Sequence, residues 1–325
     1  MFFSEMFRHI FAVVESLAVF VTVLFSTGQT VMPGDYLEQL NRITIYENRA
    51  QTALPQTAAR SLVMRHFSAP RTDGKTPKCL LIGFDGARAD ALTNAVSGES
   101  GVSALLSGGG AAYHMYAGGD RLNKQKTETS PGWTTLLTGH WAKVSGGTGH
   151  GVSRNGIRKA VNPKLVFTDL LEQNLAQKTA FAVSWDGHFA DGDAAYVNDI
   201  AYAAANGLNA GWYTLPDDAG TFAKTQAEIE SGADMVMCIF EHCDHAGHDS
   251  GFGNQNPAYV QAFRDADRYA FALIQAVRAR PTYAAEDWLI LITSDHGGIG
   301  KSHGGQFSVE RQTFLVTNMP CGFND

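Results

Sequence analysis

The chain has 325 residues, of which 44% are hydrophobic and 18% are charged, so it is long enough for one large globular domain. Its formal net charge is −7, and overall charge therefore gives no reason to expect a nucleic acid polymer or an anionic surface as a partner.

The N-terminal segment, residues 1–27, contains an apolar run over 10–25 that is preceded by Arg8 and interrupted by Glu15. A basic start followed by an apolar stretch resembles a signal peptide or a short signal-anchor. A spanning helix needs about 20 apolar residues, so an amphipathic or buried N-terminal helix is the alternative. We therefore expect an extracytoplasmic protein, secreted or anchored to the membrane by its N-terminus, with a cytoplasmic location as the alternative.

Residues 28–77 are mixed and polar, and we expect them to form a lead-in segment with a helix or two. From residue 78 onward the chain contains short apolar runs, which are typical of buried strands in a parallel sheet. These runs lie at 79–84, 179–184, 235–240, 288–293 and 313–317. Helical patterns separate several of them, at 165–175, 221–231 and 259–279. The alternation predicts an α/β catalytic domain over residues 78–325, with a mostly parallel central sheet and helices on both faces.

Three of the predicted strands run directly into acidic or histidine-rich residues. Asp85 follows the first strand, Glu-His-Cys-Asp-His-Ala-Gly-His follows the strand at 235–240, and Ser-Asp-His-Gly follows the strand at 288–293. Ligands of such sheets bind outside the carboxyl ends of the strands. We therefore expect the three clusters to meet at one edge of the sheet.

The residue types in these clusters are those of a metal site. Asp244 and His248 are four residues apart, so one helical turn brings both side chains to the same side. Asp295 and His296 are adjacent at a strand end, and His303 follows in a loop flanked by glycines. Aspartate and histidine ligands without a thiolate suit Zn²⁺, although Mn²⁺ or iron would also accept them. Any one of these residues alone could be a loop residue or a helix cap, whereas three clusters at three strand ends favour a metal site.

A candidate nucleophile precedes these clusters, in the segment Thr-Glu-Thr-Ser-Pro-Gly-Trp over residues 127–133. Pro131 is expected as the first residue of a helix, with Thr129 or Ser130 as its N-cap. A hydroxyl at a helix N-terminus faces free backbone N–H groups and the positive end of the helix dipole, which favours phosphate binding. A bound metal would lower the pKa of the hydroxyl and make it a nucleophile. The alternative is that the hydroxyl is a plain N-cap, which needs no metal.

Together these segments resemble the alkaline phosphatase superfamily, specifically its type I phosphodiesterase and nucleotide pyrophosphatase family. The resemblance covers roughly residues 78 to 318, and its specificity comes from the order of the motifs rather than from any one of them. The segments that carry it are Leu-Leu-Ile-Gly-Phe-Asp-Gly over 80–86, Lys-Thr-Glu-Thr-Ser-Pro-Gly-Trp-Thr-Thr-Leu-Leu-Thr-Gly over 126–139, and the segments 241–248, 294–297 and 302–305.

The resemblance implies two divalent metal ions, with Zn²⁺ as the expected metal, and a threonine phospho-enzyme intermediate. Thr129 would attack phosphorus, and water would then hydrolyse the phosphothreonine. The first ion would be held by Asp85, Thr129, Asp295 and His296, and the second by Asp244, His248 and His303. His242 and His245 are alternative ligands if the local register differs.

Some positions depart from the family pattern. Nucleotide pyrophosphatases usually carry an asparagine that helps to bind phosphate where this chain has Gly132, and Asn155 in a later loop is a candidate replacement.

Trp133 is a candidate to stack on a base or an aromatic leaving group, with a plain packing role as the alternative. Residues 185–188, Trp-Asp-Gly-His, follow a predicted strand and are interpreted as a loop cap or as part of the substrate cleft. The Cys/Ser-x-Pro-x-Arg nucleophile motif of sulfatases is absent from the sequence.

The expected function is therefore hydrolysis of phosphate esters by a metal-dependent phosphodiesterase or nucleotide pyrophosphatase. Its substrate would be a small-molecule phosphate ester or a nucleotide. A phosphomonoesterase that uses the same site is the alternative enzyme. A surface binding protein with a degenerate site is the alternative outside the enzymes, and the complete set of predicted ligands argues against it.

Overall fold

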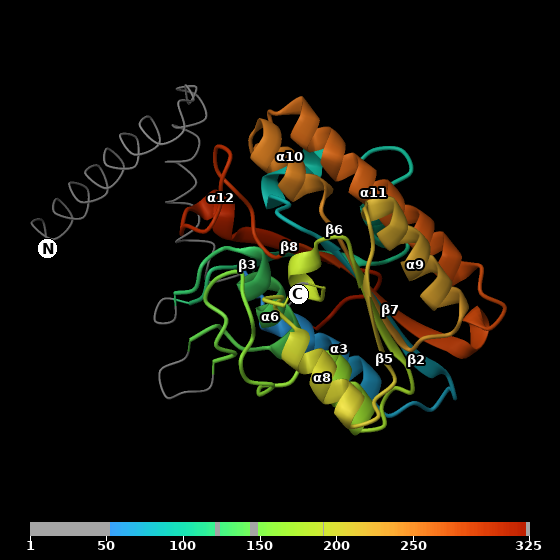
Figure 1. Cartoon of the computed structure of the whole chain (residues 1–325). Coiled ribbons are helices and arrows are strands. Elements are labelled where there is room, and N and C mark those ends of the chain that lie inside the picture. Colours follow the sequence, from blue (N-terminus) through green and yellow to red (C-terminus); the bar gives the residue numbers. More distant parts are fainter. Residues whose placement is uncertain (1–52, 121–123, 144–148, 191, 323–325) are drawn as a thin grey trace, which may run out of the picture.

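The computed structural model describes residues 53–120, 124–143, 149–190 and 192–322. Within them the chain folds around one eight-stranded sheet in the order β1-β3-β8-β7-β2-β6-β4-β5, and helices cover both of its faces (Figure 1). The strands are β1 (Leu54–Pro55), β2 (Thr76–Phe84), β3 (Ala111–Tyr116), β4 (Thr179–Val183), β5 (Ala210–Thr214), β6 (Met235–Phe240), β7 (Glu286–Thr293) and β8 (Gln312–Thr317). The α-helices are α3 (Ala58–Ser68), α4 (Leu92–Ala95), α5 (Gly101–Leu106), α6 (Thr129–Thr138), α7 (Val166–Glu172), α8 (Val197–Ala205), α9 (Asp218–Glu230), α10 (His242–Ser250), α11 (Pro257–Arg278) and α12 (Ser308–Arg311). Short 3-10 helices lie at η1 (Ala89–Ala91), η2 (Asp186–His188) and η3 (Tyr283–Ala285).

The central strand β2 divides the core into two layers. Leu80 and Ile82 belong to one hydrophobic cluster, whereas Cys79 and Leu81 belong to the other, because successive side chains of a strand point to opposite faces. The first cluster is completed by side chains of α5, α9 and α11, and the second by side chains of α3, α6 and α7. A strand that is buried on both faces needs apolar residues at consecutive positions, which explains the continuous apolar runs of β2, β6 and β7.

Helix α11 shows how the packing of the sheet also positions the site. Asn256 caps its N-terminus by accepting a hydrogen bond from the N–H of Ala258 (3.1 Å), and Pro257 occupies the first turn. Its buried side chains recur every three or four residues and face the sheet. The first of them, Tyr259, donates its hydroxyl to the carbonyl of Gly86 (2.6 Å) and so fixes the turn that follows β2.

The predicted fold class is confirmed. The strands β5, β4, β6, β2 and β7 run parallel to one another, and helices lie on both faces of the sheet. The run at 313–317 forms β8, but this strand is antiparallel to both β7 and β3, so the sheet is mixed there. Strands β3 and β5 were not predicted, because each is only partly buried and lacks a continuous apolar run.

The predicted signal peptide or signal-anchor over residues 1–27 lies outside the described residues, as does the first half of the lead-in segment, up to residue 52. The described part of the lead-in contains β1, which pairs with β3, and α3, whose buried face joins the second hydrophobic cluster. The domain boundary at residue 78 stays a prediction. In the described parts of the chain, no helix combines the length and the apolar character that crossing a membrane requires.

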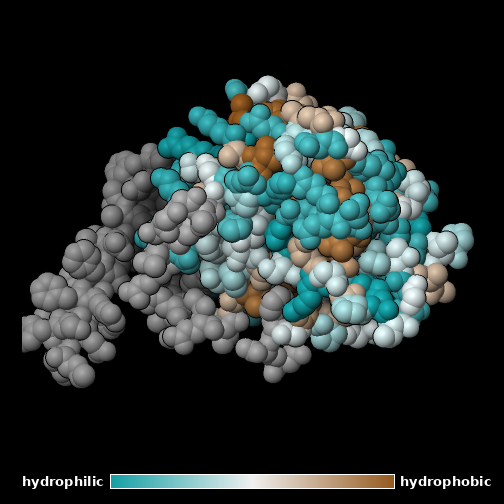
Figure 2. Space-filling view, turned by 90° about the horizontal axis from the view of Figure 1, so that it is seen from below, coloured by the Kyte–Doolittle hydropathy of each residue, from teal (hydrophilic) through white to brown (hydrophobic). Residues whose placement is uncertain are grey.

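The face of the molecule shown in Figure 2 is mostly polar, with apolar residues in small, separate areas. This distribution agrees with the two core clusters, which take up most of the large apolar side chains.

Candidate metal and phosphate site

Asp85 stands at the end of β2, directly before a tight turn. Gly86 adopts a φ of +64° there, a left-handed conformation that a side chain would strain. A Cβ at this position would also lie 2.7 Å from Oδ1 of Asp244. The glycine therefore lets the chain turn sharply after β2 and leaves room for Asp244 of α10.

The first cluster joins Asp85 to the end of β7. Nε2 of His296 lies 3.6 Å from Oδ1 of Asp85 and 3.4 Å from Oδ2 of Asp295. The hydroxyl of Thr129 lies 3.3 Å from Oδ1 of Asp85 and 3.4 Å from Nε2 of His296. Asp85, Asp295 and His296 are fully buried, and Thr129 is 5% exposed. The four residues that the family resemblance assigns to one ion are therefore in contact.

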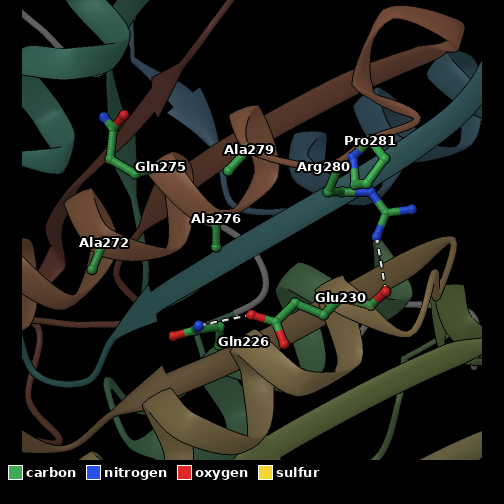
Figure 3. Close-up of a pocket in the computed structure, with 8 residues that line it drawn as sticks. All are labelled: Gln226, Glu230, Ala272, Gln275, Ala276, Ala279, Arg280 and Pro281. Atoms are coloured by element: carbon green, nitrogen blue, oxygen red, sulfur yellow. Dashed lines mark hydrogen bonds between the residues drawn. The ribbon is translucent and has the colours of Figure 1, made fainter.

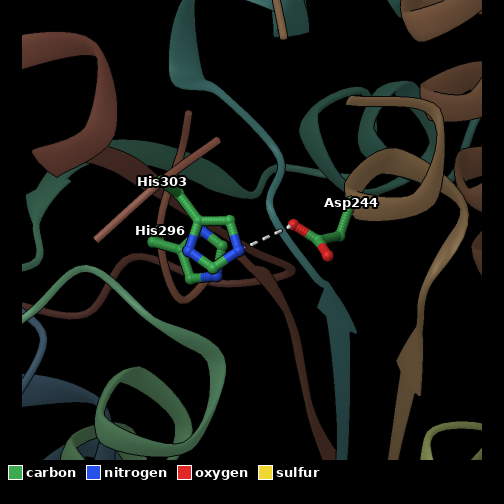
Figure 4. A group of neighbouring side chains, drawn as sticks. All are labelled: Asp244, His296 and His303. Carbon is green, nitrogen blue, oxygen red and sulfur yellow. Dashed lines mark ion pairs between the residues drawn. The ribbon is translucent and has the colours of Figure 1, made fainter. Parts of the chain in front are cut away.

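The second cluster lies on α10 and in the loop before α12. Nε2 of His248 is 3.3 Å from Oδ2 of Asp244, and Nε2 of His303 is 3.5 Å from Oδ1 of the same carboxylate. The rings of His303 and His296 stack with centroids 4.1 Å apart, so the two clusters adjoin each other (Figure 4). Asp244, His296 and His303 also form a possible ligand set of their own, which sequence analysis did not consider.

The three histidines of the two clusters each turn Nδ1 toward a backbone carbonyl and Nε2 toward the cluster. Nδ1 of His248 contacts the carbonyl of Lys301 (2.9 Å), Nδ1 of His296 that of Gly297 (2.9 Å), and Nδ1 of His303 that of Thr127 (3.0 Å). A carbonyl oxygen can only accept a hydrogen bond, so each Nδ1 must carry the proton. The neutral ring then has its lone pair on Nε2, which faces the cluster, as in histidines that ligate a metal.

The short distance between the Nε2 atoms of His248 and His303 requires a cation or a proton between them. Nε2 of His303 and Nε2 of His248 are only 3.1 Å apart. Two lone pairs at this distance repel each other unless a positive charge lies between them. Among the described residues, Oδ1 of Asp244 and Oδ2 of Asp295 also lack a hydrogen-bond partner although they are buried. This donor set of imidazole nitrogen and carboxylate oxygen fits Zn²⁺ and similar ions.

The pKa shifts of the site residues also favour a bound cation. Burial raises the pKa of Asp85 well above its usual range, and the negative charge of Asp244 raises it further. Burial likewise raises the pKa of Asp295, with Asp85 as the next cause. Burial lowers the pKa of His296 to about 3, so this ring is a neutral ligand at physiological pH. Carboxylates in such surroundings are stabilised as anions only by added positive charge.

Helix α6 begins two residues earlier than predicted. Thr129 is its first residue and Glu128 occupies the N-cap position, whereas Pro131 lies within the first turn rather than at its start. The N-cap role expected of Thr129 or Ser130 is therefore wrong. The backbone N–H of Ser130 donates to Oδ1 of Asn155 (2.9 Å), which places the predicted substrate-binding residue Asn155 beside the candidate nucleophile Thr129.

Trp133 is one helical turn beyond Thr129 and points inward. It is fully buried, and its indole N–H donates to Oδ2 of Asp85 (2.7 Å). A Cβ at Gly83 would lie only 2.3 Å from the indole ring, so this glycine makes room for it. The prediction that Trp133 stacks on a substrate is wrong because no face of the ring is accessible, and the packing alternative holds.

Replacement of Trp133 by phenylalanine is expected to preserve the packing while removing the hydrogen bond to Asp85. We expect metal affinity or turnover to fall by about 10-fold to 100-fold, the usual effect of losing a partner that orients a metal ligand. Isothermal titration of the metal-free variant with Zn²⁺ measures this effect. An affinity equal to that of the wild type would show that the indole N–H does not orient Asp85.

Asp218, which sequence analysis missed, holds helix α10 in place. Its carboxylate accepts hydrogen bonds from the backbone N–H groups of Glu241 (2.9 Å) and His242 (3.0 Å) at the N-terminus of α10. Nδ1 of His242, an alternative ligand in the sequence analysis, lies against the Asp218 carboxylate, and His245 is exposed. In the sequence Asp218 has only the signature of an acidic residue at a helix start.

Gln56, another residue that sequence analysis missed, reaches the site from the turn after β1. Its side-chain amide donates to the backbone carbonyl of Asp295 (2.5 Å), and the residue is fully buried. The described part of the lead-in segment therefore helps to position the loop that follows β7.

A pocket of about 370 Å³ lies away from this site, at the C-terminal ends of α9 and α11 (Figure 3). The carboxyl ends of the parallel strands face the N-terminal ends of these helices, so the pocket is at the opposite end of the helical layer. Arg280 at its rim is paired with Glu286 (2.7 Å). None of the predicted site residues lines it.

The sequence over residues 79–305 matches the family model of type I phosphodiesterase / nucleotide pyrophosphatase. The chain belongs to this family. The family consists of hydrolases that act on phosphoric ester bonds, and the match extends from β2 to the His303 loop, so it includes every predicted metal ligand. A search of the curated proteins found no match.

Several solved structures are similar to this member of the phosphodiesterase family. Murine ectonucleotide pyrophosphatase / phosphodiesterase 5 is 19% identical, with a TM-score of 0.44 over 68% of this chain and 57% of that chain. The human protein of the same name is 20% identical, with a TM-score of 0.46 and the same coverage. An alkaline phosphatase superfamily protein from Vibrio parahaemolyticus is 12% identical, with a TM-score of 0.47 over 79% of this chain and 67% of that one. The chain thus spans 57% of the length of the two mammalian structures.

Proposed function

We propose that this chain is a metal-dependent hydrolase of phosphoric diesters, including nucleotides, with Thr129 as its nucleophile. The observation that carries the proposal is the position of the Thr129 hydroxyl, within 3.4 Å of both Asp85 and His296 at the N-terminus of α6. A phosphate next to this hydroxyl would face the positive end of the helix dipole.

Two divalent ions, with Zn²⁺ as the best match to the ligands, would polarise the phosphoryl oxygens and lower the pKa of the hydroxyl. Asp85, Asp295 and His296 would hold one ion together with Thr129, and Asp244, His248 and His303 would hold the other. Asp85 also accepts a hydrogen bond from Thr129 and so fixes the direction of the hydroxyl. Attack by its oxygen on phosphorus would form a phosphothreonine ester and release the first alcohol or nucleotide group, and water would then hydrolyse the ester.

The choice of diesters follows from the family and not from the details of the phosphate site. A Cβ at Gly132 would lie 2.8 Å from Cβ and 2.9 Å from the carbonyl oxygen of Asp295, so this position has no room for the asparagine typical of the family. Asn155 is the candidate replacement, because it is exposed and already bound to the nucleophile turn. A phosphomonoesterase on the same site remains the second candidate function.

The proposal is tested with a nitrophenyl phosphodiester and the corresponding monoester, each assayed with and without a chelator. We expect turnover of the diester that the chelator removes and added Zn²⁺ restores. A higher kcat/KM for the monoester would select the second candidate. Turnover of neither substrate in zinc-loaded protein would contradict both.

Zinc affinity is expected to rise with pH. A hydrogen bond to Asp244 raises the pKa of His248 to about 9 in the metal-free protein, so His248 carries a proton at pH 7. A metal can bind Nε2 only after this proton has left, and one proton is therefore released per ion bound there. Affinity should rise about tenfold per pH unit from pH 6 to 8 and level off above pH 9.

Competition with a chromophoric chelator, corrected for the protonation of the chelator, measures this dependence. The His248→Ala variant is the control and should lose the steep pH dependence together with one ion. A wild-type affinity that does not change between pH 6 and 8 would contradict the assignment of His248 as a ligand.

A further inference from the structure

Asn155 lies in an exposed loop, a few residues before a fully buried arginine. The side chains of Ser153, Arg154 and Asn155 are all exposed, whereas Arg158 has no exposed surface. The partner of Arg158 is the carboxylate of Asp199, which lies in the first turn of α8 and is equally buried. The loop that carries Asn155 is thus fixed at one end by an ion pair inside the protein.

The hydrogen bonds of Arg158 hold it in one orientation. Nε and Nη2 of its guanidinium donate to Oδ2 (3.0 Å) and Oδ1 (2.7 Å) of Asp199, and Nη1 donates to the carbonyl of Pro163 (2.7 Å). The backbone N–H of Arg158 donates to the carbonyl of Ala195 (2.8 Å), and its carbonyl accepts from the side-chain amide of Asn198 (3.0 Å). A bidentate pair of this kind fixes geometry as well as adding attraction, because the planar guanidinium matches the carboxylate.

The start of α8 is also joined to α6, the helix that begins with Thr129. Tyr196 is the N-cap residue of α8, and its hydroxyl lies 3.1 Å from that of Thr134 in α6. Both of these side chains are fully buried. The first turn of α8 therefore contacts both α6 and the loop of Asn155, and it sets the position of one relative to the other.

The side chain of Asn155 is oriented by the second residue of α6. Its Oδ1 accepts from the N–H of Ser130 (2.9 Å), so the carboxamide turns its oxygen toward the helix. Its NH₂ group is then the part that can donate to a phosphoryl oxygen beside Thr129. The first N–H groups of a helix have no partner within it, and the first such bond of α6 runs from Gly132 to Glu128 (2.9 Å). Asn155 therefore supplies an acceptor that the helix itself does not offer to Ser130.

We propose that Arg158 and Asp199 are positioning residues of the phosphate site, which hold Asn155 against the N-terminus of α6. Neither residue touches the substrate, and both act through Asn155. A buried ion pair adds little net stability, because the cost of desolvating both charges offsets their attraction, so the gain from this pair is in geometry. The effect on turnover rests on the proposed function, whereas the effect on the contact between Asn155 and Ser130 rests on the fold alone.

A double-mutant cycle tests this role in the zinc-loaded, full-length protein. Arg158→Met combined with Asp199→Leu removes both charges and fills the space, a type of replacement that often preserves stability. We expect it to reduce kcat/KM for the nitrophenyl phosphodiester about tenfold or more, because the phosphate contact is misplaced. Asn155→Ala should cause a loss at least as large, and adding the paired replacement to it should cause no further loss. An equal loss in both backgrounds would show that the ion pair acts on the fold and not through Asn155, and would overturn the proposal.

A second ion pair provides the matched control. Arg280 donates from Nε and Nη2 to the two carboxylate oxygens of Glu286, at the end of the helical layer away from the site. Arg280→Met combined with Glu286→Leu should leave kcat/KM at the wild-type value.

Amide hydrogen exchange, followed by NMR, tests the positioning without any turnover. Exchange at Ser130 should become roughly twofold to tenfold faster in Asn155→Ala, the factor that one hydrogen bond contributes, and equally faster in the variant without the ion pair. Faster exchange in Asn155→Ala alone would overturn the proposal. If the wild type turns over neither ester, the proposed function fails, and the exchange at Ser130 still decides the role of Arg158. If the paired replacement does not fold, Arg158→Lys, which keeps the charge but not the planar guanidinium, takes its place in both measurements.

Discussion

Replacement of Thr129 by alanine is expected to reduce turnover of a phosphodiester by about 10³-fold or more, because the variant has no hydroxyl to attack phosphorus. Its metal content should equal that of the wild type. The other proposed ligands of the first ion, Asp85, Asp295 and His296, are fully buried and held by other contacts. Steady-state kinetics together with elemental analysis of the same sample measure both quantities.

Two matched variants test whether the loss of turnover is due to the Thr129 hydroxyl itself. Thr129→Ser keeps the hydroxyl and should retain part of the activity. Ser130→Ala removes the neighbouring hydroxyl, which is buried and has no hydrogen-bond partner within the described residues, so turnover should remain near that of the wild type. If Ser130→Ala were the inactive variant, the nucleophile would be Ser130, and the register of the family resemblance would be off by one residue.

Replacement of Asp295 by asparagine is expected to remove one ion per chain and reduce turnover at least about 100-fold, yet to stabilise the metal-free protein. Oδ1 of Asp295 accepts a hydrogen bond from the N–H of Gly86 (3.2 Å), which an amide oxygen would preserve. Oδ2 has no hydrogen-bond partner among the described residues and lies 3.4 Å from Nε2 of His296. An amide NH₂ group at this position would donate to the lone pair of Nε2.

The pH dependence of this stabilisation has a definite sign. Burial, followed by the charge of Asp85, raises the pKa of Asp295 above its value in the unfolded chain. The folded metal-free protein therefore loses stability as pH rises from the unfolded-state pKa toward the raised value. An asparagine does not titrate, so the variant should exceed the metal-free wild type in Tm at pH 7 to 8, by about 2–4 °C for each kcal/mol. The difference should shrink toward pH 4.

Thermal unfolding in the presence of a chelator measures this difference, and the same measurement with Zn²⁺ should reverse the order of the two proteins. A metal-free Asp295→Asn protein that is less stable than the wild type at pH 7 to 8 would show that the carboxylates of the site do not repel each other in the fold.

The parts of the fold that could be predicted are those whose sequence signal is local. Strands β2, β6 and β7 are buried on both faces, so each needs a continuous apolar run, and the polar residue after each run marks the edge where ligands gather. Asp85 and the pair Asp295–His296 were found in this way, and the structure brings them together. The i, i+4 spacing of Asp244 and His248 likewise follows from helical geometry alone.

The parts that could not be predicted depend on packing between distant segments. His188 is buried because the rings of Phe181 in β4, Trp185 before η2 and Tyr196 before α8 surround it, and no spacing in the sequence predicts this. The interaction of Gln56 with Asp295 joins residues 239 positions apart. For Trp133 a signal was present: Gly83 interrupts an otherwise apolar strand, and such a glycine marks the close approach of a large group.

The most direct test of the account is a crystal structure of the zinc-loaded protein with bound phosphate, measured at the zinc absorption edge. We predict one ion in contact with Asp85, Asp295 and His296, a second in contact with Asp244, His248 and His303, and phosphorus beside the Thr129 hydroxyl. A single ion held jointly by Asp244, His296 and His303, with Thr129 in contact with neither metal nor phosphate, would contradict it.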